Sequence, residues 1–179
     1  LGTSGAAYKW VKETFFTQMD YPSLNKIASI APPGSNGTIF LPHLSGASCP
    51  HWDSDATATF TGLHLASSPS DIIRSVLEGI AYQIRANLEV IQSYVSLESL
   101  ILFGGGAKSS FWTEIICNVK NKAVYYSPAP EMALLGACLL AAKGTGYQEE
   151  IEAAFPRLEP MHTPDQYLAS QYEELFQKY

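Results

Sequence analysis

Apolar residues fall at helical spacing in some stretches of the chain and in short runs bounded by turn residues in others. Helical spacing predicts helices over the segments 4–19, 69–94, 109–119, 131–146 and 164–179. The short runs predict strands over 38–44, 59–65, 98–103 and 123–128. Because strands and helices alternate in the middle of the chain, we expect right-handed crossovers and a sheet that is largely parallel there. The pattern indicates an α/β fold.

The first predicted helix has a candidate N-cap and one apolar face. Ser4 is the candidate cap, because its side-chain oxygen can accept a bond from a free backbone N–H of the first turn. Helical spacing places four apolar side chains on one face, and these are Ala7, Trp10, Val11 and Phe15. We expect this face to pack against the core.

The long helix over 69–94 begins after Ser68 or Ser70, and both serines are candidate caps. Arg74 and Glu78 stand four residues apart on it, which is the spacing of an ion pair on one helix face. Arg85 stands further along the same helix. We interpret the Arg74–Glu78 pair as structural, on the helix surface or partly buried.

Composition limits the classes of partner. A chain of 179 residues, 46% hydrophobic and 16% charged, suffices for one globular domain with its own core. Its formal net charge of -6 argues against nucleic acid or an anionic membrane as the main partner, because both bind basic surfaces. Nor does any apolar run approach the ~20 residues of a membrane span.

Cysteine usage and the first residues bear on the setting of the chain. Cys49, Cys117 and Cys138 are odd in number and far apart, which argues against a disulfide framework or a zinc site and favours a reducing cytoplasm. The chain opens on a glycine-rich turn without an initiating Met, so we expect it to belong to a longer protein.

One loop gathers residue types that bind metals. His43, His51, Asp53 and Asp55 lie within a short stretch, but they lack the spacing typical of zinc ligands. Asp side chains in loops commonly accept bonds from their own backbone. We therefore interpret the stretch as a polar loop and assign no metal ligand.

Three consecutive glycines, Gly104 to Gly106, follow the strand over 98–103 and precede a helix. Free backbone N–H groups and the positive end of a helix favour an anion or a nucleotide at such a turn. The pattern is neither a Walker loop nor a Rossmann fingerprint, and a tight turn without a ligand is the alternative. Ser109 or Ser110 caps the following helix, and either hydroxyl could also reach a ligand.

A second glycine pair, Gly2 and Gly5, stands at the start of the first helix. One interpretation of this pair is a capped helix start. The other is that the two glycine turns face each other and hold two sides of one ligand. The sequence leaves this choice open.

Two long segments resemble the C-terminal domain of the FGGY carbohydrate kinases, and the xylulokinase branch is the most similar. These are LPHLSGASCPHWDSDATATFTGLHLASSPSDIIRSVLEGIAYQIRANLEVI and LILFGGGAKSSFWTEIICNVKNKAVYYSPAPEMALLGACLLAAKGTG. Within the first, residues 58–62 and 71–78 resemble the second signature of the family. The resemblance runs from about Gly5 to the last helix.

The resemblance implies an actin-like, ribonuclease-H-like fold, with a mixed sheet and flanking helices that here lacks its first strands. Residues 1–179 would form the C-terminal nucleotide-binding domain. The N-terminal domain, which would supply the catalytic aspartate and bind most of the sugar, would lie before Leu1. The implied function is phosphorylation of a ketopentose with Mg-ATP in the cytoplasm. No catalytic residue is expected in this chain, the isolated chain is expected to be inactive, and a homodimer is kept open.

The resemblance also implies nucleotide contacts. Gly105, Gly106 and Ala107 match the adenosine-binding turn, and Ser109 or Ser110 stands where relatives often have Asn or Ser. Gly5 matches a glycine that approaches the nucleotide. Lys9 stands where the glycerol kinases have a nucleotide-contacting Gln. The opening GTSG resembles the phosphate-binding GTS loop of the family, but it lies too close to LPHLSG and is assigned to the helix start.

One loop departs from the family pattern. It reads LSGASCPHWD where LSGERTPHWD is usual, so Ala47, Ser48 and Cys49 replace an acidic-basic pair and a threonine. The resemblance therefore implies no role for an acidic-basic pair in this loop. Two other functions stay open, and these are a non-catalytic ATP-sensing or assembly module on the actin-like fold and a structural domain whose glycines serve packing alone.

Overall fold

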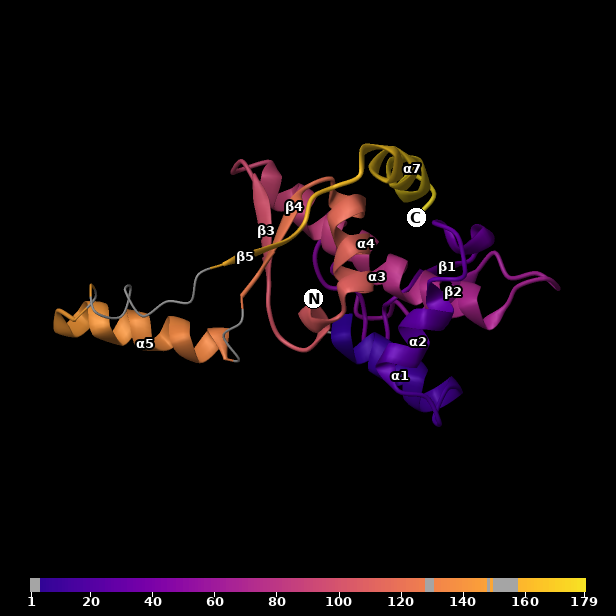
Figure 1. Ribbon diagram of the computed structural model, residues 1–179, viewed down its shortest axis with the longest axis horizontal. Coiled ribbons are helices and arrows are strands. Elements are labelled where there is room, and N and C mark those ends of the chain that lie inside the picture. Colours follow the sequence, from indigo (N-terminus) through magenta and orange to yellow (C-terminus); the bar gives the residue numbers. More distant parts are fainter. Residues whose placement is uncertain (1–3, 128–130, 148, 150–157) are drawn as a thin grey trace.

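A computed structural model describes residues 4–127, 131–147, 149 and 158–179 (Figure 1). Its helices are α1 (Ser4–Phe15), α2 (Tyr21–Ala28), α3 (Pro69–Gln92), α4 (Ser110–Lys120), α5 (Met132–Thr145) and α7 (Gln166–Phe176), with 3-10 turns η1 (Ser35–Gly37) and η2 (Gly106–Lys108). Its strands are β1 (Ile39–Leu41), β2 (Thr59–Thr61), β3 (Ser99–Leu102), β4 (Ala123–Tyr126) and β5 (Glu159–His162). The predicted α/β class is confirmed.

The main sheet has the strand order β3-β4-β5. Strands β3 and β4 are parallel, with Ser99 opposite Ala123, and α4 connects them, which confirms the predicted parallel pairing. Strand β5 runs antiparallel to β4 and was not predicted, because its sequence EPMH shows no apolar run. Strands β1 and β2 form a separate antiparallel pair.

Helix α3 is the centre of the core. Figure 1 shows it with α1 and α2 on one side and α4 on the other, and its side chains Ile73, Val76, Leu77 and Ile80 are fully buried. Ser68 caps it, because the Ser68 hydroxyl accepts a bond from the Asp71 backbone while the Asp71 carboxylate accepts one from the Ser68 backbone. Of the two candidate serines, Ser68 is the cap.

The buried face of α1 differs from the predicted one. Ala7 and Val11 are buried as predicted, but Trp10 is 39% and Phe15 56% exposed. Tyr8 is buried in their place. The rings of Trp10 and Phe15 pack edge to face on each other with centroids 5.5 Å apart, so this pair covers part of its own apolar surface outside the core.

The Arg74–Glu78 pair lies in the interior, deeper than the sequence alone indicated. Arg74 Nε is 2.7 Å from Glu78 Oε1, and the two side chains are 9% and 2% exposed. Tyr172 of α7 donates its hydroxyl to Glu78 and accepts a bond from Arg74. The Glu78 carboxylate also accepts from the Ser35 hydroxyl and the Gly34 backbone. The pair therefore fastens α3, the turn at η1 and the last helix together.

Helix α3 and strand β1 approach too closely for any side chain at Gly79. A Cβ built there would lie 2.0 Å from the Phe40 carbonyl oxygen. We expect Gly79→Ala to destabilise the protein by about 3 kcal/mol, the upper end of the cost of overpacking, despite the better helix propensity of alanine. Urea unfolding measures the change. Gly144→Ala is the control, because a Cβ there meets no atom within 4 Å beyond the nearby backbone of its own helix; an equal loss in both variants would contradict the close approach as the cause.

Helix α5 is apolar on all sides and little of it is covered. Leu134 is 63% and Leu140 74% exposed, and Figure 1 shows the helix lying apart from the other elements. A helix with apolar residues around its whole circumference normally has partners on several faces. Within the described part of the chain, every helix is too short or too polar to cross a membrane.

Candidate nucleotide-binding site

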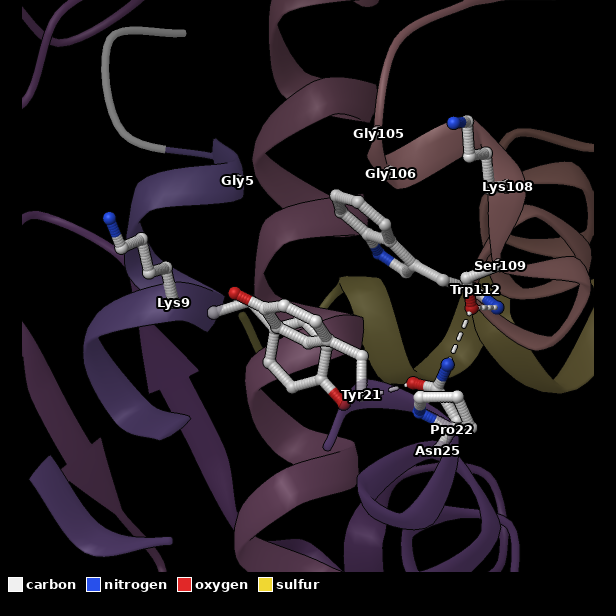
Figure 2. Close-up of a pocket in the computed structure, with 11 residues that line it drawn as sticks. Gly5, Lys9, Tyr21, Pro22, Asn25, Gly105, Gly106, Lys108, Ser109 and Trp112 are labelled. Carbon is white, nitrogen blue, oxygen red and sulfur yellow. Dashed lines mark hydrogen bonds between the residues drawn. The ribbon is translucent and has the colours of Figure 1, made fainter. Parts of the chain in front are cut away.

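A cavity of about 590 Å³ opens between α1, α2 and the glycine turn that precedes α4 (Figure 2). Backbone at Gly5, Gly105 and Gly106 forms part of its lining. Rings of Tyr8, Tyr21 and Trp112 and the side chain of Pro22 form apolar walls. The cavity is therefore bounded by bare backbone and by aromatic rings.

Five of the seven predicted site residues line this cavity. They are Gly5, Lys9, Gly105, Gly106 and Ser109. Ala107 is buried and lines a smaller neighbouring cavity of about 200 Å³, which also touches Gly5 and Gly106. Ser110 is exposed and lies outside the lining, with its hydroxyl 3.4 Å from His162 Nε2. The two glycine turns thus face one cavity, with Gly5 on the side of the first helix, while Gly2 lies outside the described residues.

The protein structure requires glycine at some positions of the turn and not at others. Gly104 has a φ of 80°, a conformation that favours glycine. A Cβ on Gly106 would lie 2.3 Å from the Trp112 ring, so packing inside the protein excludes a side chain there. A Cβ on Gly105 or Gly5 would meet no protein atom within 4 Å. At these two positions the protein itself leaves space for a side chain, and that space adjoins the cavity.

A chain of hydrogen bonds crosses the floor of the cavity from α1 through α2 to α4. The Tyr8 hydroxyl donates to Asn25 Oδ1 at 2.9 Å, and Asn25 Nδ2 donates to the Ser109 hydroxyl at 2.9 Å. Ser109 also accepts from the Trp112 backbone N–H, which makes it the N-cap of α4. Burial raises the pKa of Tyr8 well above its ordinary value, so its hydroxyl stays protonated at neutral pH.

Charge around the cavity is positive. Lys9 and Lys108 line it from opposite sides in Figure 2, and the ammonium of Lys9 is 3.8 Å from Glu13 in an exposed pair. Neither a carboxylate nor an imidazole is among the described residues that line it. The N-terminus of α4 at Ser109 adds free backbone N–H groups. Such a site favours an anionic ligand.

Several lining residues were missed in the sequence. They are Tyr8, Tyr21, Pro22, Asn25, Lys108 and Trp112. Helix α2 (Tyr21–Ala28), which carries three of them, has only eight residues and was not predicted. Asp20 followed by Pro22 is a signal that could have found it, because an Asp cap before an early Pro is typical of a helix start.

The loop that carries His43, His51, Asp53 and Asp55 contains one of the expected bonds between an Asp side chain and nearby backbone. Asp53 accepts a bond from the Asp55 backbone N–H at 2.9 Å. The His43 and His51 rings are 6.3 Å apart, centroid to centroid. Across the described ranges of the chain, groups of three or more His, Cys, Asp or Glu placed to bind a metal do not occur.

Solved structures share this fold. A ligand-bound xylulose kinase from Lactobacillus acidophilus matches 98% of this chain with a TM-score of 0.88 at 27% identity. A xylulose kinase from Rhodospirillum rubrum matches 97% with a TM-score of 0.83 at 26% identity. In each case the match covers 36% of the solved chain. The protein thus has the actin-like ATPase fold, with a mixed sheet and flanking helices.

Sequence comparison defines the family. The family model described as the C-terminal domain of the FGGY family of carbohydrate kinases matches residues 3–145. A xylulose kinase of Staphylococcus epidermidis is 31% identical over 98% of this chain, and a gluconokinase of Bacillus subtilis is 26% identical over 98%. The chain spans 36% and 37% of the length of these relatives. This chain belongs to the FGGY carbohydrate kinases as their C-terminal domain.

Proposed function

We propose that this domain binds ATP for a carbohydrate kinase that phosphorylates a ketopentose, as a xylulose kinase does. The observation that carries the nucleotide site is the cavity in which Gly5 and Gly105, from two elements far apart in sequence, both leave open space. Relatives named xylulose kinase support the sugar. Relatives named gluconokinase make a sugar acid the second candidate substrate.

The dimensions and chemistry of the cavity fit an adenosine. Its volume of about 590 Å³ lies within the range of pockets that hold ligands of this size. The rings of Tyr8, Tyr21 and Trp112 offer apolar surface to a flat base, and the glycine backbone allows close approach. Lys9 and Lys108 favour the negative charge of the phosphates. Bound ATP would supply the γ-phosphoryl group, and no lining residue is assigned to Mg²⁺.

The remaining parts of the reaction belong to the whole kinase. We assign the aspartate that removes a proton from the sugar hydroxyl, and most sugar contacts, to a part of the protein outside this chain. The cytoplasm, where ATP is abundant, is the proposed location. A homodimer is kept open as the assembly of the protein. The alternative function is a non-catalytic ATP-sensing or assembly module, which predicts ATP binding without phosphorylation of any sugar.

Gly105→Val tests the nucleotide site in the whole kinase. A Cβ at this position meets no protein atom within 4 Å, and the added side chain adjoins the cavity. We expect the KM for ATP to rise roughly a hundredfold, equivalent to about 3 kcal/mol of lost binding, with little change in the KM for the sugar. Steady-state kinetics with each substrate varied in turn measures both constants.

Gly144→Val is the matched control, because its Cβ also meets no protein atom and it does not line the cavity. It should leave both constants unchanged. A folded Gly105→Val enzyme with an unchanged KM for ATP would contradict the proposed site.

A further inference from the structure

The side-chain amide of Asn25 lies between two hydroxyl groups at the cavity floor. Its oxygen faces the Tyr8 hydroxyl and its nitrogen faces the Ser109 hydroxyl, each at 2.9 Å. Figure 2 shows Asn25 below the cavity, joined to Ser109. In this orientation the Tyr8 hydroxyl is the donor and the Ser109 hydroxyl the acceptor, and rotation of the amide by half a turn would require both hydroxyls to exchange these roles.

Counting donors and acceptors shows what these groups leave for a ligand. Ser109 Oγ accepts from Asn25 Nδ2 and from the Trp112 backbone, so its remaining capacity is the donation of its own proton. Asn25 keeps one acceptor lone pair on Oδ1 and one donor hydrogen on Nδ2. At the cavity floor a ligand can therefore bond to one acceptor, Asn25 Oδ1 near Tyr8, and to two donors, Asn25 Nδ2 and the Ser109 hydroxyl.

We propose that Asn25 selects the base of the nucleotide, accepting a bond from an amino group and donating one to the adjacent unprotonated ring nitrogen. Adenine presents that pair of groups, and an Asn amide matches it with two bonds. Guanine presents a keto oxygen beside a ring N–H, which is the reverse polarity. A guanine would therefore place its keto oxygen against Oδ1. Tyr8 acts in this as a positioning residue that holds the amide. The inference rests on the proposed nucleotide site and extends it to base specificity.

Two substitutions in the whole kinase test the role of the amide. Asn25→Ala removes both contacts to the base. Tyr8→Phe keeps the ring that walls the cavity but removes the hydroxyl that is hydrogen-bonded to the amide. For the unmodified enzyme we expect kcat/KM with ATP to exceed that with GTP, and each variant should lower this ratio roughly tenfold, as expected for one well-matched pair of base contacts. Tyr94→Phe, which changes an 85% exposed side chain, should leave the ratio unchanged.

The outcomes separate this inference from the proposed function. If Gly105→Val weakens ATP binding but Tyr8→Phe and Asn25→Ala leave the ratio unchanged, the nucleotide site stands and base selection by Asn25 is wrong. If the unmodified enzyme prefers GTP, the amide faces the opposite way and the assignment is overturned. If Gly105→Val has no effect on ATP, the proposed function itself fails. If Asn25→Ala does not fold, Tyr8→Phe alone tests the inference.

Discussion

The isolated chain is expected to produce no ADP when it is mixed with Mg-ATP and a pentulose, under conditions in which the whole kinase turns over. The reason lies in the composition of the cavity. Its described lining contains lysines, hydroxyls and one amide, but neither a carboxylate nor an imidazole that would accept the proton of a sugar hydroxyl. A coupled ADP assay with and without sugar measures the difference.

Nucleotide binding serves as the control for that experiment. An isolated chain that binds ATP, with binding weakened by Gly105→Val, has formed the cavity, and its lack of turnover then reports on missing catalytic groups. Sugar-dependent ADP formation by the purified chain would show that the catalytic base lies within residues 1–179, contrary to the proposal.

The second large effect is expected at Glu78. Glu78→Ala leaves the Arg74 guanidinium in the interior without its carboxylate, and it removes the acceptor shared by Tyr172, Ser35 and Gly34. Removal of one member of a buried ion pair costs about 3–5 kcal/mol, which is a large part of the stability of a domain. We expect a loss of that size in the free energy of unfolding, measured by urea denaturation.

The chain offers a matched control on the same helix. Arg85 and Glu89 form an Arg–Glu pair with the same spacing at 2.8 Å, but Glu89 is 44% exposed. Glu89→Ala should cost no more than about 1 kcal/mol. Similar losses in the two variants would mean that the burial of Glu78 has little energetic consequence. A double variant, Arg74→Met with Glu78→Met, should recover only part of the loss, because it leaves no unpaired buried charge but still removes the acceptor of Ser35 and Tyr172.

The sequence predicted the helices with strong periodicity and the parallel pairing of β3 with β4, because local spacing determines both. It did not predict strand β5, which includes Pro160 and forms through pairing with β4. The deep burial of the Arg74–Glu78 pair could not be predicted from the sequence either. Burial there depends on α7, whose Tyr172 is 94 residues from Glu78 along the chain.

The residues of the candidate site also fall into those with a local sequence signal and those without one. The glycine turn and Ser109 could be named because a strand, glycines and a helix cap follow one another in sequence. Asn25 has no such local signal. Its place in the cavity follows from a hydrogen bond to Ser109 that spans 84 residues, and hence from the approach of α2 to the residue that caps α4. The predicted face of α1 was wrong at Trp10 and Phe15 for a related reason, since tertiary contacts buried Tyr8 where periodicity favoured Trp10.

The position of Trp112 gives the protein an optical reporter of its own. Trp112 is 7% exposed, lines the cavity beside Gly106 and donates its indole N–H to the Leu77 carbonyl at 3.2 Å. Trp10 and Trp52 are 39% and 77% exposed and lie outside the cavity lining. A base that stacks in the cavity would change the emission of the shielded indole first. Phenylalanine at positions 10 and 52 would leave a chain whose remaining fluorescence follows occupancy of the cavity directly, without a labelled nucleotide.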